Sequence, residues 1–227
     1  MQTITTLEVR ESILNNNDEL AKGNRERLRG DNIFLVNIMG SPGAGKTTLL
    51  KRTIEGLRDE YRVAVIEADV DSAVDAESIA ESGARVIQLH TGGLCHLDAK
   101  MAGEGLEKLI SEAGEEKPEV IFIENIGNLV CPAEFDIGAA LQVMLLSVPE
   151  GDDKPLKYPL MFEVSDCLLV SKLDAAEVFD FDLEALRERV GQLNPGMEII
   201  PLSALKGDGT KAWIDYLKAR IEEWKAG

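Results

Sequence analysis

Apolar residues recur along this chain in short runs separated by longer amphipathic stretches. The first run, residues 33–39 (IFLVNIM), is followed by Leu49, Leu50, Ile54 and Leu57 at helical spacing. A short β-branched run predicts a buried strand, and the spacing after it predicts a helix. Similar runs predict strands at residues 62–67, 84–89, 119–124, 143–148, 167–171 and 198–202, and residues 213–224 predict a closing amphipathic helix.

Alternation of strands and helices is typical of an α/β fold with a mostly parallel central sheet and helices on both faces. The 227 residues are enough for one large core, so we expect a single α/β domain over residues 31–227. Residues 1–30 are expected to form an N-terminal helical extension, with one or two helices in the polar stretch 7–28. That stretch has few apolar positions, which predicts weakly specified packing. Residues 151–159 (GDDKPLKYP) predict a loop.

Acidic residues outnumber basic ones, 41 against 24, which gives a formal net charge of −17. This charge repels nucleic acid and anionic membranes, so we expect neither as a partner; it suits cations, although solubility alone also explains it. No apolar run approaches a membrane span and no signal sequence is recognisable, so we expect a cytoplasmic protein. Three cysteines are too few for a disulfide framework and are expected to be thiols or metal ligands.

The segment GSPGAGKT, residues 40–47, fits the pattern G-x-x-x-x-G-K-[ST] and lies between a predicted strand and a predicted helix. Its glycines let backbone N–H groups surround phosphate oxygens at a helix N-terminus. Lys46 is placed to bridge the terminal phosphates, and the Thr47 hydroxyl is placed to hold Mg²⁺. The segment therefore predicts a nucleotide site, with binding residues Gly40, Ser41, Gly43, Ala44, Gly45, Lys46, Thr47 and Thr48.

Two acidic stretches follow other strands, at the edge where open α/β sheets bind ligands. Asp69 and Asp75 come after the second strand and suit Mg²⁺ or its water shell, although a helix start explains Asp75 equally well. Glu124 begins the sequence ENIG, which is close to the D-x-x-G element of GTPases; its acid orients Mg²⁺ water and the Gly127 N–H meets the γ-phosphate. Lys46, Asp75 and Glu124 are the candidate catalytic residues.

The sequence SKLD, residues 171–174, is similar to the guanine motif N-K-x-D. Asp174 would accept from the guanine N1 and N2 groups, while the Lys172 stem lies along the base. Ser171 replaces the usual Asn, so we expect the hydrogen bond that braces this loop to be shortened or missing. Ser203 and Ala204 resemble the second base loop of GTPases. Together with the phosphate loop, these motifs favour GTP over ATP and make residues 31–227 a P-loop GTPase domain.

Thiol and imidazole groups occur in two further loops. Cys95 and His96 follow the third strand, and Cys131 lies four positions past Gly127. Thiolate and imidazole are ligands that Zn²⁺ and Ni²⁺ favour. Either loop alone is weak evidence, but both leave strand C-termini and can converge, so we predict a transition-metal site there. Cys167, within an apolar strand, is expected to be a buried small residue.

These residues carry a resemblance to a known family: the chain resembles the HypB hydrogenase nickel-incorporation GTPases, of the SIMIBI class of P-loop proteins. The resemblance rests on the sequences NNNDELAKGNRERL, GSPGAGKTTLL, EADVDSAVDAE, TGGLCHLDAKM, FIENIGNLVCPAEFD, LLSVPEGDDKPLKYPLMF, SKLD and PLSALKGDG. It implies GTP hydrolysis coupled to nickel delivery into [NiFe] hydrogenase, with Asp75 in switch I and Cys95, His96 and Cys131 on the metal. The implied cofactors are GTP, Mg²⁺ and Ni²⁺ or Zn²⁺. The implied partners are a second copy in a homodimer, a HypA-type nickel metallochaperone and the hydrogenase large subunit precursor.

Two other functions share part of this pattern. An accessory GTPase for urease or a cobalamin enzyme would have the same nucleotide site and another client, but the pairing of CHLDA with CPAEFD argues against it. A metal-free regulatory GTPase would make the cysteines structural. Metal analysis of the purified protein separates the second alternative from a metal carrier.

Overall fold

The computed structural model describes residues 9–69 and 74–227, without the side chains of residues 9–12 and 74. The start of the predicted N-terminal helical stretch and part of the acidic stretch after Asp69 therefore lie outside the described residues. Within them, the strands form one sheet in the order β3-β2-β4-β1-β5-β6-β7, and every neighbouring pair is parallel. The predicted parallel α/β sheet is confirmed. Its strands are β1 Phe34–Gly40, β2 Val63–Asp69, β3 Arg85–His90, β4 Val120–Glu124, β5 Leu141–Ser147, β6 Cys167–Ser171 and β7 Glu198–Pro201.

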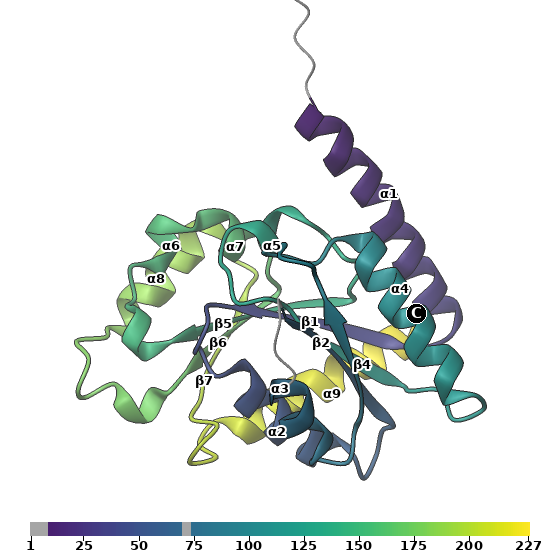
Figure 1. Cartoon of the computed structure of the whole chain (residues 1–227). Helices are drawn as coiled ribbons and strands as arrows, with labels where there is room; N and C mark the ends of the chain where they lie inside the picture. Colours follow the sequence, from purple (N-terminus) through teal and green to yellow (C-terminus); the bar gives the residue numbers. More distant parts are fainter. Residues whose placement is uncertain (1–8, 70–73) are drawn as a thin grey trace, which may run out of the picture.

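Helices cover both faces of the sheet (Figure 1). One face packs on α2 Lys46–Leu57, α3 Val74–Ala80 and α9 Thr210–Ala226. The other face packs on α1 Val9–Gly30, α4 Ala99–Ala113, α5 Cys131–Glu134, α7 Pro159–Glu163 and α8 Leu183–Leu193. β1 is central and fully buried, with Val36 in one core and Leu35 in the other, because successive side chains of a strand point to opposite faces.

Among the described residues, the N-terminal stretch forms one helix, α1, which packs against α4 while its first turns project from the body (Figure 1). The expectation of weakly specified packing is wrong. Ala21 and Leu28 are buried, and so is the amide of Asn17. The helix is therefore docked by polar side chains as well as apolar ones, which a search for apolar periodicity does not detect.

The stretch predicted as a loop is also more regular than its composition indicates. A 3₁₀ turn, η1 Val148–Glu150, is followed by two short helices, α6 Lys154–Lys157 and α7 Pro159–Glu163. Pro155 and Pro159 lie in the first turn of each short helix, where a missing backbone N–H costs nothing. A second 3₁₀ turn, η2 Leu173–Ala175, follows β6. No described helix has the length and apolar character that a membrane span needs.

Candidate functional site

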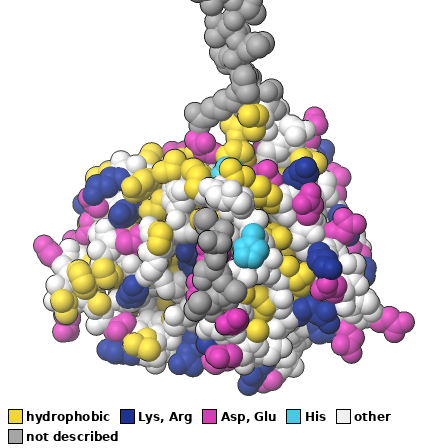
Figure 2. Space-filling model, in the orientation of Figure 1, with side chains coloured by type: hydrophobic (Ala, Val, Ile, Leu, Met, Phe, Trp, Pro, Cys, Tyr) yellow, Lys and Arg dark blue, Asp and Glu magenta, His cyan; other side chains and the backbone are white. Residues whose placement is uncertain are grey.

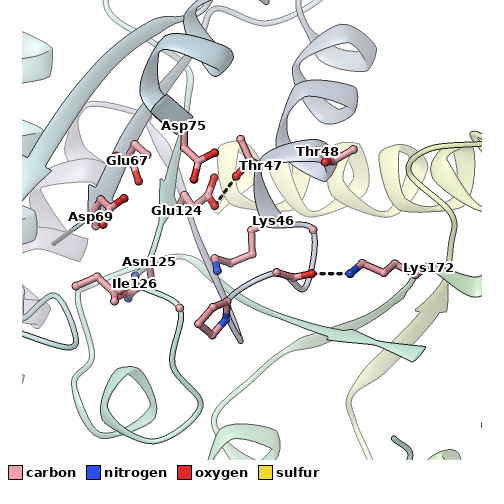
Figure 3. A pocket seen from close by; sticks show the side chains of 15 residues that line it. Lys46, Thr47, Thr48, Glu67, Asp69, Asp75, Glu124, Asn125, Ile126 and Lys172 are labelled. Carbon is pink, nitrogen blue, oxygen red and sulfur yellow. Dashed lines mark hydrogen bonds between the residues drawn. The ribbon is translucent and has the colours of Figure 1, made fainter. Parts of the chain in front are cut away.

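A cavity of about 690 Å³ opens at the carboxyl ends of β1, β2, β4 and β6 (Figure 3). Open parallel sheets bind ligands at this edge. Among the described residues, its lining includes Pro42, Gly43, Gly45, Lys46, Thr47, Thr48, Glu67, Ala68, Asp69, Asp75, Glu124, Asn125, Ile126, Gly127 and Lys172. The cavity thus brings together the phosphate loop, both predicted acidic stretches and one residue of the predicted base loop.

The phosphate loop turns directly into α2. Gly45, with φ 98°, is the left-handed residue before the first helical residue, Lys46, and a Cβ-bearing residue would be strained there. Lys46 is only 8% exposed, and its Nζ donates to the carbonyls of Gly40 and Ser41 at 3.4 and 3.3 Å. Burial lowers the pKa of Lys46, while Glu124 opposes that shift. A helix N-terminus and a buried ammonium group face the same cavity, which suits polyphosphate.

Glu124 ends β4 beside the start of α2. Its Oε1 accepts a hydrogen bond from the Thr47 hydroxyl at 3.0 Å, and its other oxygen is buried without a hydrogen-bond partner among the described residues. Burial raises the pKa of Glu124 to about 7, against the opposing effects of Lys46 and Thr47. A hydroxyl and a carboxylate so placed provide oxygen ligands of the kind that Mg²⁺ prefers.

Glu67 was not among the predicted site residues, yet it completes the acidic side of the cavity. It is 3% exposed, and one oxygen atom each of Glu67, Asp69 and Asp75 lie within 4.8 Å of one another. Burial, and next the neighbouring Glu124, raise the pKa of Glu67 to about 8. The sequence signal was available: Glu67 is the single charged residue in the otherwise apolar run VAVIEA of β2.

The loop after Glu124 lies against the phosphate loop. A Cβ on Gly127 would come within 2.7 Å of Pro42 Cγ and 2.8 Å of its nitrogen, so glycine is required by this close approach. One residue later, the Asn128 N–H donates to the Gly40 carbonyl at 3.2 Å. The segment that leads to Cys131 is therefore attached to the phosphate loop at two successive positions.

Asn125 is a second residue that the sequence analysis missed. It is 1% exposed, and its amide nitrogen donates to Asn37 Oδ1 of β1 at 3.2 Å. Its amide oxygen accepts from the backbone N–H groups of Ile126 and Leu97 at 2.9 and 3.4 Å. Because Leu97 directly follows His96, this one side chain joins the nucleotide cavity to the loop that carries Cys95 and His96.

The base loops are attached to the phosphate loop more firmly than predicted. The bracing hydrogen bond of Ser171, which we expected to be shortened or missing, is present: the buried Ser171 hydroxyl donates to the Ala44 carbonyl at 2.6 Å. Lys172 Nζ donates to the Gly43 carbonyl at the same distance. Asp174 Oδ1 accepts from the Ser203 hydroxyl at 2.6 Å, and this hydrogen bond lowers the pKa of Asp174.

Some predicted residues support the cavity without lining it. Asp174 and Ser203 lie beyond its rim, linked through the backbone hydrogen bond from Leu173 to Leu202. The Ala204 carbonyl accepts from Arg52 of α2 at 3.2 Å. Gly40, Ser41 and Ala44 contribute backbone carbonyls to the hydrogen bonds described above.

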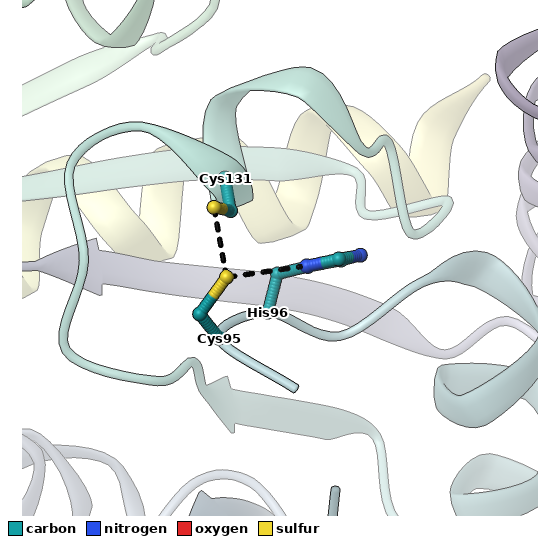
Figure 4. A group of neighbouring side chains, drawn as sticks. All are labelled: Cys95, His96 and Cys131. Atoms are coloured by element: carbon teal, nitrogen blue, oxygen red, sulfur yellow. Dashed lines mark hydrogen bonds between the residues drawn. The ribbon is translucent and has the colours of Figure 1, made fainter. Parts of the chain in front are cut away.

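The structure brings the two cysteine-bearing loops together (Figure 4). The Sγ atoms of Cys95 and Cys131 are 2.8 Å apart, and Cys95 Sγ is 3.9 Å from His96 Nδ1. One ligand atom from each of the three residues lies within 4.8 Å of the others. Two thiols and an imidazole at this spacing form a donor set that fits Ni²⁺ or Zn²⁺.

The His96 ring is held by Phe135, which stacks on it with ring centroids 3.9 Å apart and planes 20° apart. Burial lowers the pKa of His96, which favours the neutral imidazole that binds metals. Cys167 is fully buried in β6, as predicted, and burial raises its pKa. His90 lies exposed at the end of β3 and is not part of this cluster.

Comparison with known proteins agrees with this geometry. Residues 34–201 match the family model described as "CobW/HypB/UreG, nucleotide-binding domain". Hydrogenase maturation factor HypB of Rhizobium leguminosarum bv. viciae is 43% identical over 217 residues, which are 94% of this chain and 71% of that protein. Hydrogenase/urease maturation factor HypB of Helicobacter pylori is 40% identical over 215 residues, 94% of this chain and 87% of that protein.

A solved structure gives the same result. HypB from Helicobacter pylori in complex with nickel matches with a TM-score of 0.87 and 37% identity, covering 92% of this chain and 96% of that chain. Both the sequence and the three-dimensional arrangement are therefore shared over nearly the whole described chain. This chain belongs to the HypB family of hydrogenase maturation factors, within the wider CobW/HypB/UreG group of nucleotide-binding proteins.

Proposed function

We propose that this protein is a Mg²⁺-dependent GTPase that binds nickel as cargo at the cluster of Cys95, His96 and Cys131 and assists its insertion during hydrogenase maturation. One observation carries the proposal. The loop from Glu124 to Cys131 contacts the phosphate loop at its start and supplies a thiol to the metal cluster at its end. A change at the phosphates therefore has a short covalent path to a metal ligand.

Hydrolysis of GTP in such a site depends mainly on positioning and electrostatics. The α2 N-terminus and Lys46 offset the negative charge of the phosphates, and Thr47, Asp69 and Asp75 provide oxygen atoms that suit Mg²⁺. Glu124 is close enough to Thr47 to orient a water in the same shell. In this assignment Lys46, Asp75 and Glu124 act in catalysis, and Glu67 adds a further buried carboxyl.

Selection of guanine is assigned to the loops after β6 and β7. Asp174 offers a carboxylate whose Oδ1 is oriented by Ser203, and its second oxygen and the Lys172 stem are available to a base. Two donors on guanine match one carboxylate, whereas adenine has no such pair. The hydrogen bonds from Ser171 and Lys172 to the phosphate loop keep the base loop and the phosphate loop in fixed relation.

Coupling between nucleotide and nickel follows from two connections. Gly127 and Asn128 link the Cys131 segment to the phosphate loop, and Asn125 links the Cys95–His96 segment to the same wall of the cavity. A contact between the γ-phosphate and the Gly127 N–H would shift one segment relative to the other. The distances between metal ligands, and with them the metal affinity, would then depend on the nucleotide.

The cluster offers three protein ligands from one chain, whereas tetrahedral and square-planar sites take four. We assign the remaining position to water or to a second copy of the chain in a two-fold homodimer. Leu94 and Val130 support the second option, since these apolar side chains adjoin Cys95 and Cys131 and are 44% and 50% exposed. On the face drawn in Figure 2, apolar side chains gather below the point where α1 leaves the body.

The partners proposed for this cycle are a HypA-type nickel metallochaperone and the hydrogenase large subunit precursor. The HypB relatives are named hydrogenase maturation factors, which supports the hydrogenase precursor, and the HypA-type partner rests on the family resemblance. In this cycle, the GTP-bound homodimer holds nickel and hydrolysis changes its affinity, so that the metal passes to the next protein.

Nickel titration by calorimetry, with GDP and with a non-hydrolysable GTP analogue, tests the proposal. Both states are measured at concentrations where the protein is dimeric. We expect nickel affinities that differ by the factor corresponding to about 1–3 kcal/mol of coupling, and GTP affinity should change by the same factor when nickel is bound. Cys131→Ala should abolish this difference and leave GTP binding by the apo protein intact. Identical nickel affinities in the two nucleotide states would contradict the proposal.

One observation favours a second enzyme as a recipient of the nickel. The Helicobacter pylori relative carries urease as well as hydrogenase in its name. A nickel enzyme other than hydrogenase would use the same GTPase and the same cluster. Nickel incorporation assays with both apoenzymes, each supplied with nickel-loaded protein and GTP, distinguish a single client from two.

A further inference from the structure

Docking of α1 depends on amide side chains that reach the two segments carrying the metal ligands. Asn17 is 4% exposed although its neighbours in the run Asn15-Asn16-Asn17 are exposed. Its amide oxygen accepts from the Ala99 N–H at 2.8 Å, and its amide nitrogen donates to the Asp136 carbonyl at 2.8 Å. Both polar ends of this buried side chain are therefore paired with backbone.

Each of these backbone partners is close to a metal ligand in sequence. Ala99 follows His96 by three positions and begins α4, whose N-terminus is capped by Asp98. Asp136 follows Cys131 by five positions and comes directly after Phe135. One side chain of α1 thus connects the segment that carries Cys95 and His96 to the segment that carries Cys131.

Neighbouring contacts make this connection stiff. Asn24, two turns further along α1, donates to the carbonyls of Ala99 and Ile137 at 2.8 and 3.2 Å. Gly138 has φ 87°, and a Cβ there would come within 2.4 Å of the Ala21 carbonyl. The chain that follows Cys131 therefore lies directly against α1, and its backbone has little room to move away.

The stacked pair of His96 and Phe135 connects the two segments held by α1 to a metal ligand directly. Phe135 belongs to the Cys131 segment and His96 to the other, so the stack forms only when the two segments are at the right separation. Holding the Asp136 carbonyl fixes the residue next to Phe135, and holding the Ala99 N–H fixes the start of α4 after His96. Partners beyond the ligands themselves commonly set metal affinity in this way.

We propose that Asn17 is a positioning residue for the metal cluster: it clamps the two ligand-bearing segments together and so sets the separation of Cys95 and His96 from Cys131. The inference rests on the proposed function in taking this cluster as a metal site. It goes further in making α1 part of that site. Whatever moves α1 would then change metal affinity without touching a ligand.

The test compares Asn17→Ala with Asn15→Ala, which removes the same kind of side chain from an exposed position on the same helix. Nickel affinity and the thiolate-to-nickel charge-transfer band are measured for both. Asn17→Ala should bind nickel several-fold more weakly, because Asn24 still bridges the same two segments, and its band should shift. Asn15→Ala should match the unmodified protein, and both variants should retain GTP affinity.

A metal-free measurement separates failure of the clamp from failure of the metal assignment. Diamide oxidises neighbouring thiols to a disulfide and is itself reduced to the hydrazine. The intramolecular Cys95–Cys131 disulfide should form several-fold more slowly in apo Asn17→Ala than in apo Asn15→Ala, with non-reducing gels excluding cross-linked dimers. If no nickel binds to any variant but this difference is present, the clamp stands and the metal assignment fails.

Asn17→Asp provides the second variant, because it keeps the acceptor for Ala99 and loses the donor to Asp136. Its new carboxylate oxygen faces the Asp136 carbonyl, so it should separate the two segments at least as much as Asn17→Ala in both measurements, and circular dichroism establishes that each protein is folded. If Asn17→Ala lowers the melting temperature but leaves the charge-transfer band and the disulfide rate unchanged, Asn17 only stabilises the fold and the proposal is wrong.

Discussion

The nucleotide cavity and the cysteine–histidine cluster lie on the same edge of the sheet but are built in different ways. The cavity takes most of its groups from buried strand ends, from the phosphate loop and from the start of α2, and Lys46, Glu67 and Glu124 are almost fully buried. The cluster takes Cys95 and His96 from a loop and Cys131 from the first residue of the short helix α5, and Cys95 is exposed. Its geometry is set by side chains around it, Asn125 on the nucleotide side and Asn17 on the side of α1.

This difference fits two different tasks. A phosphate site must present fixed charges to every nucleotide that arrives, and the dense core of the sheet provides that rigidity. A site for cargo must both bind and release a metal. When only a few hydrogen bonds fix the distance between the ligands, the loss of one bond changes the metal affinity by roughly several-fold. The protein stays folded, because one such bond is a small part of its stability.

The largest effect expected from this comparison is that of Lys46→Ala. Hydrolysis should fall on the order of 10²- to 10³-fold, as when one transition-state donor is removed. Nickel affinity of the apo protein should stay unchanged, because the hydrogen bonds of Lys46 go to the phosphate loop and Lys46 is not part of the cluster. A phosphate-release assay measures the loss of hydrolysis, and a nickel titration measures the nickel affinity. Lys211→Ala, an exposed change in α9, serves as the control and should hydrolyse GTP normally; a loss of nickel binding in Lys46→Ala would show that the two regions are not separable.

The next effect concerns the choice of base. Asp174→Asn should weaken GTP binding by roughly 10-fold or more, because a carboxylate that accepts two hydrogen bonds is lost. Xanthosine triphosphate should bind better, since the Asn amide donates to the carbonyl that replaces the guanine amine. The Asn oxygen can still accept from Ser203, so the loop should keep its shape. Competition binding measures the affinity for each nucleotide. An equal loss of affinity for GTP and for xanthosine triphosphate would contradict the assignment of Asp174.

Sequence reasoning succeeded where the relevant residues are contiguous. The pattern from Gly40 to Thr47 specifies its own backbone path, and apolar runs locate the strands to within two residues or so. The cluster was also predicted, because the order of parallel strands brings their carboxyl ends to one edge. In both cases a local pattern and a general rule of topology were sufficient.

Most of the misses have a common physical cause. Asn17 and Asn125 act through hydrogen bonds to the backbone of distant segments, and an asparagine with such a partner looks the same in sequence as an exposed one. Glu67 differs, since a carboxyl inside an apolar strand is costly to bury and could have been recognised on that ground. Ser171 was misjudged because its partner, the Ala44 carbonyl, lies 127 positions away.

A smaller effect is expected in the nucleotide cavity, where the buried carboxyl group of Glu67 should make the stability of the protein depend on pH. The pKa of Glu67 is raised from about 4.5 to about 8 in the folded protein. Between these values the folded state keeps a proton that the unfolded state has released, so the apo protein should lose stability as the pH rises through this window. Glu67→Gln removes that dependence and should melt higher than the unmodified protein, with a gap that widens toward the upper end.

Thermal melts across the window measure this gap, at roughly 2–4 °C for each kcal/mol in a chain of this size. Glu77→Gln, an exposed change in α3, is the control and should follow the unmodified protein. A gap that stays constant with pH would show that Glu67 is ionised in the folded apo protein.

The smallest effect lies in the cluster, where Phe135→Leu removes the ring stacked on His96 but keeps most of the apolar volume. An aromatic pair contributes about 0.5–1.5 kcal/mol beyond its buried area, which limits the fall in nickel affinity to roughly 10-fold or less. GTP affinity should not change, because Phe135 is separate from the phosphate loop. Phe181→Leu, which packs against the core under α8, provides a matched control that should leave nickel affinity unaltered. If Phe135→Leu weakens GTP and nickel equally, the aromatic ring stabilises the whole edge of the sheet, and the cluster is not the independently adjustable region that its hydrogen bonds indicate.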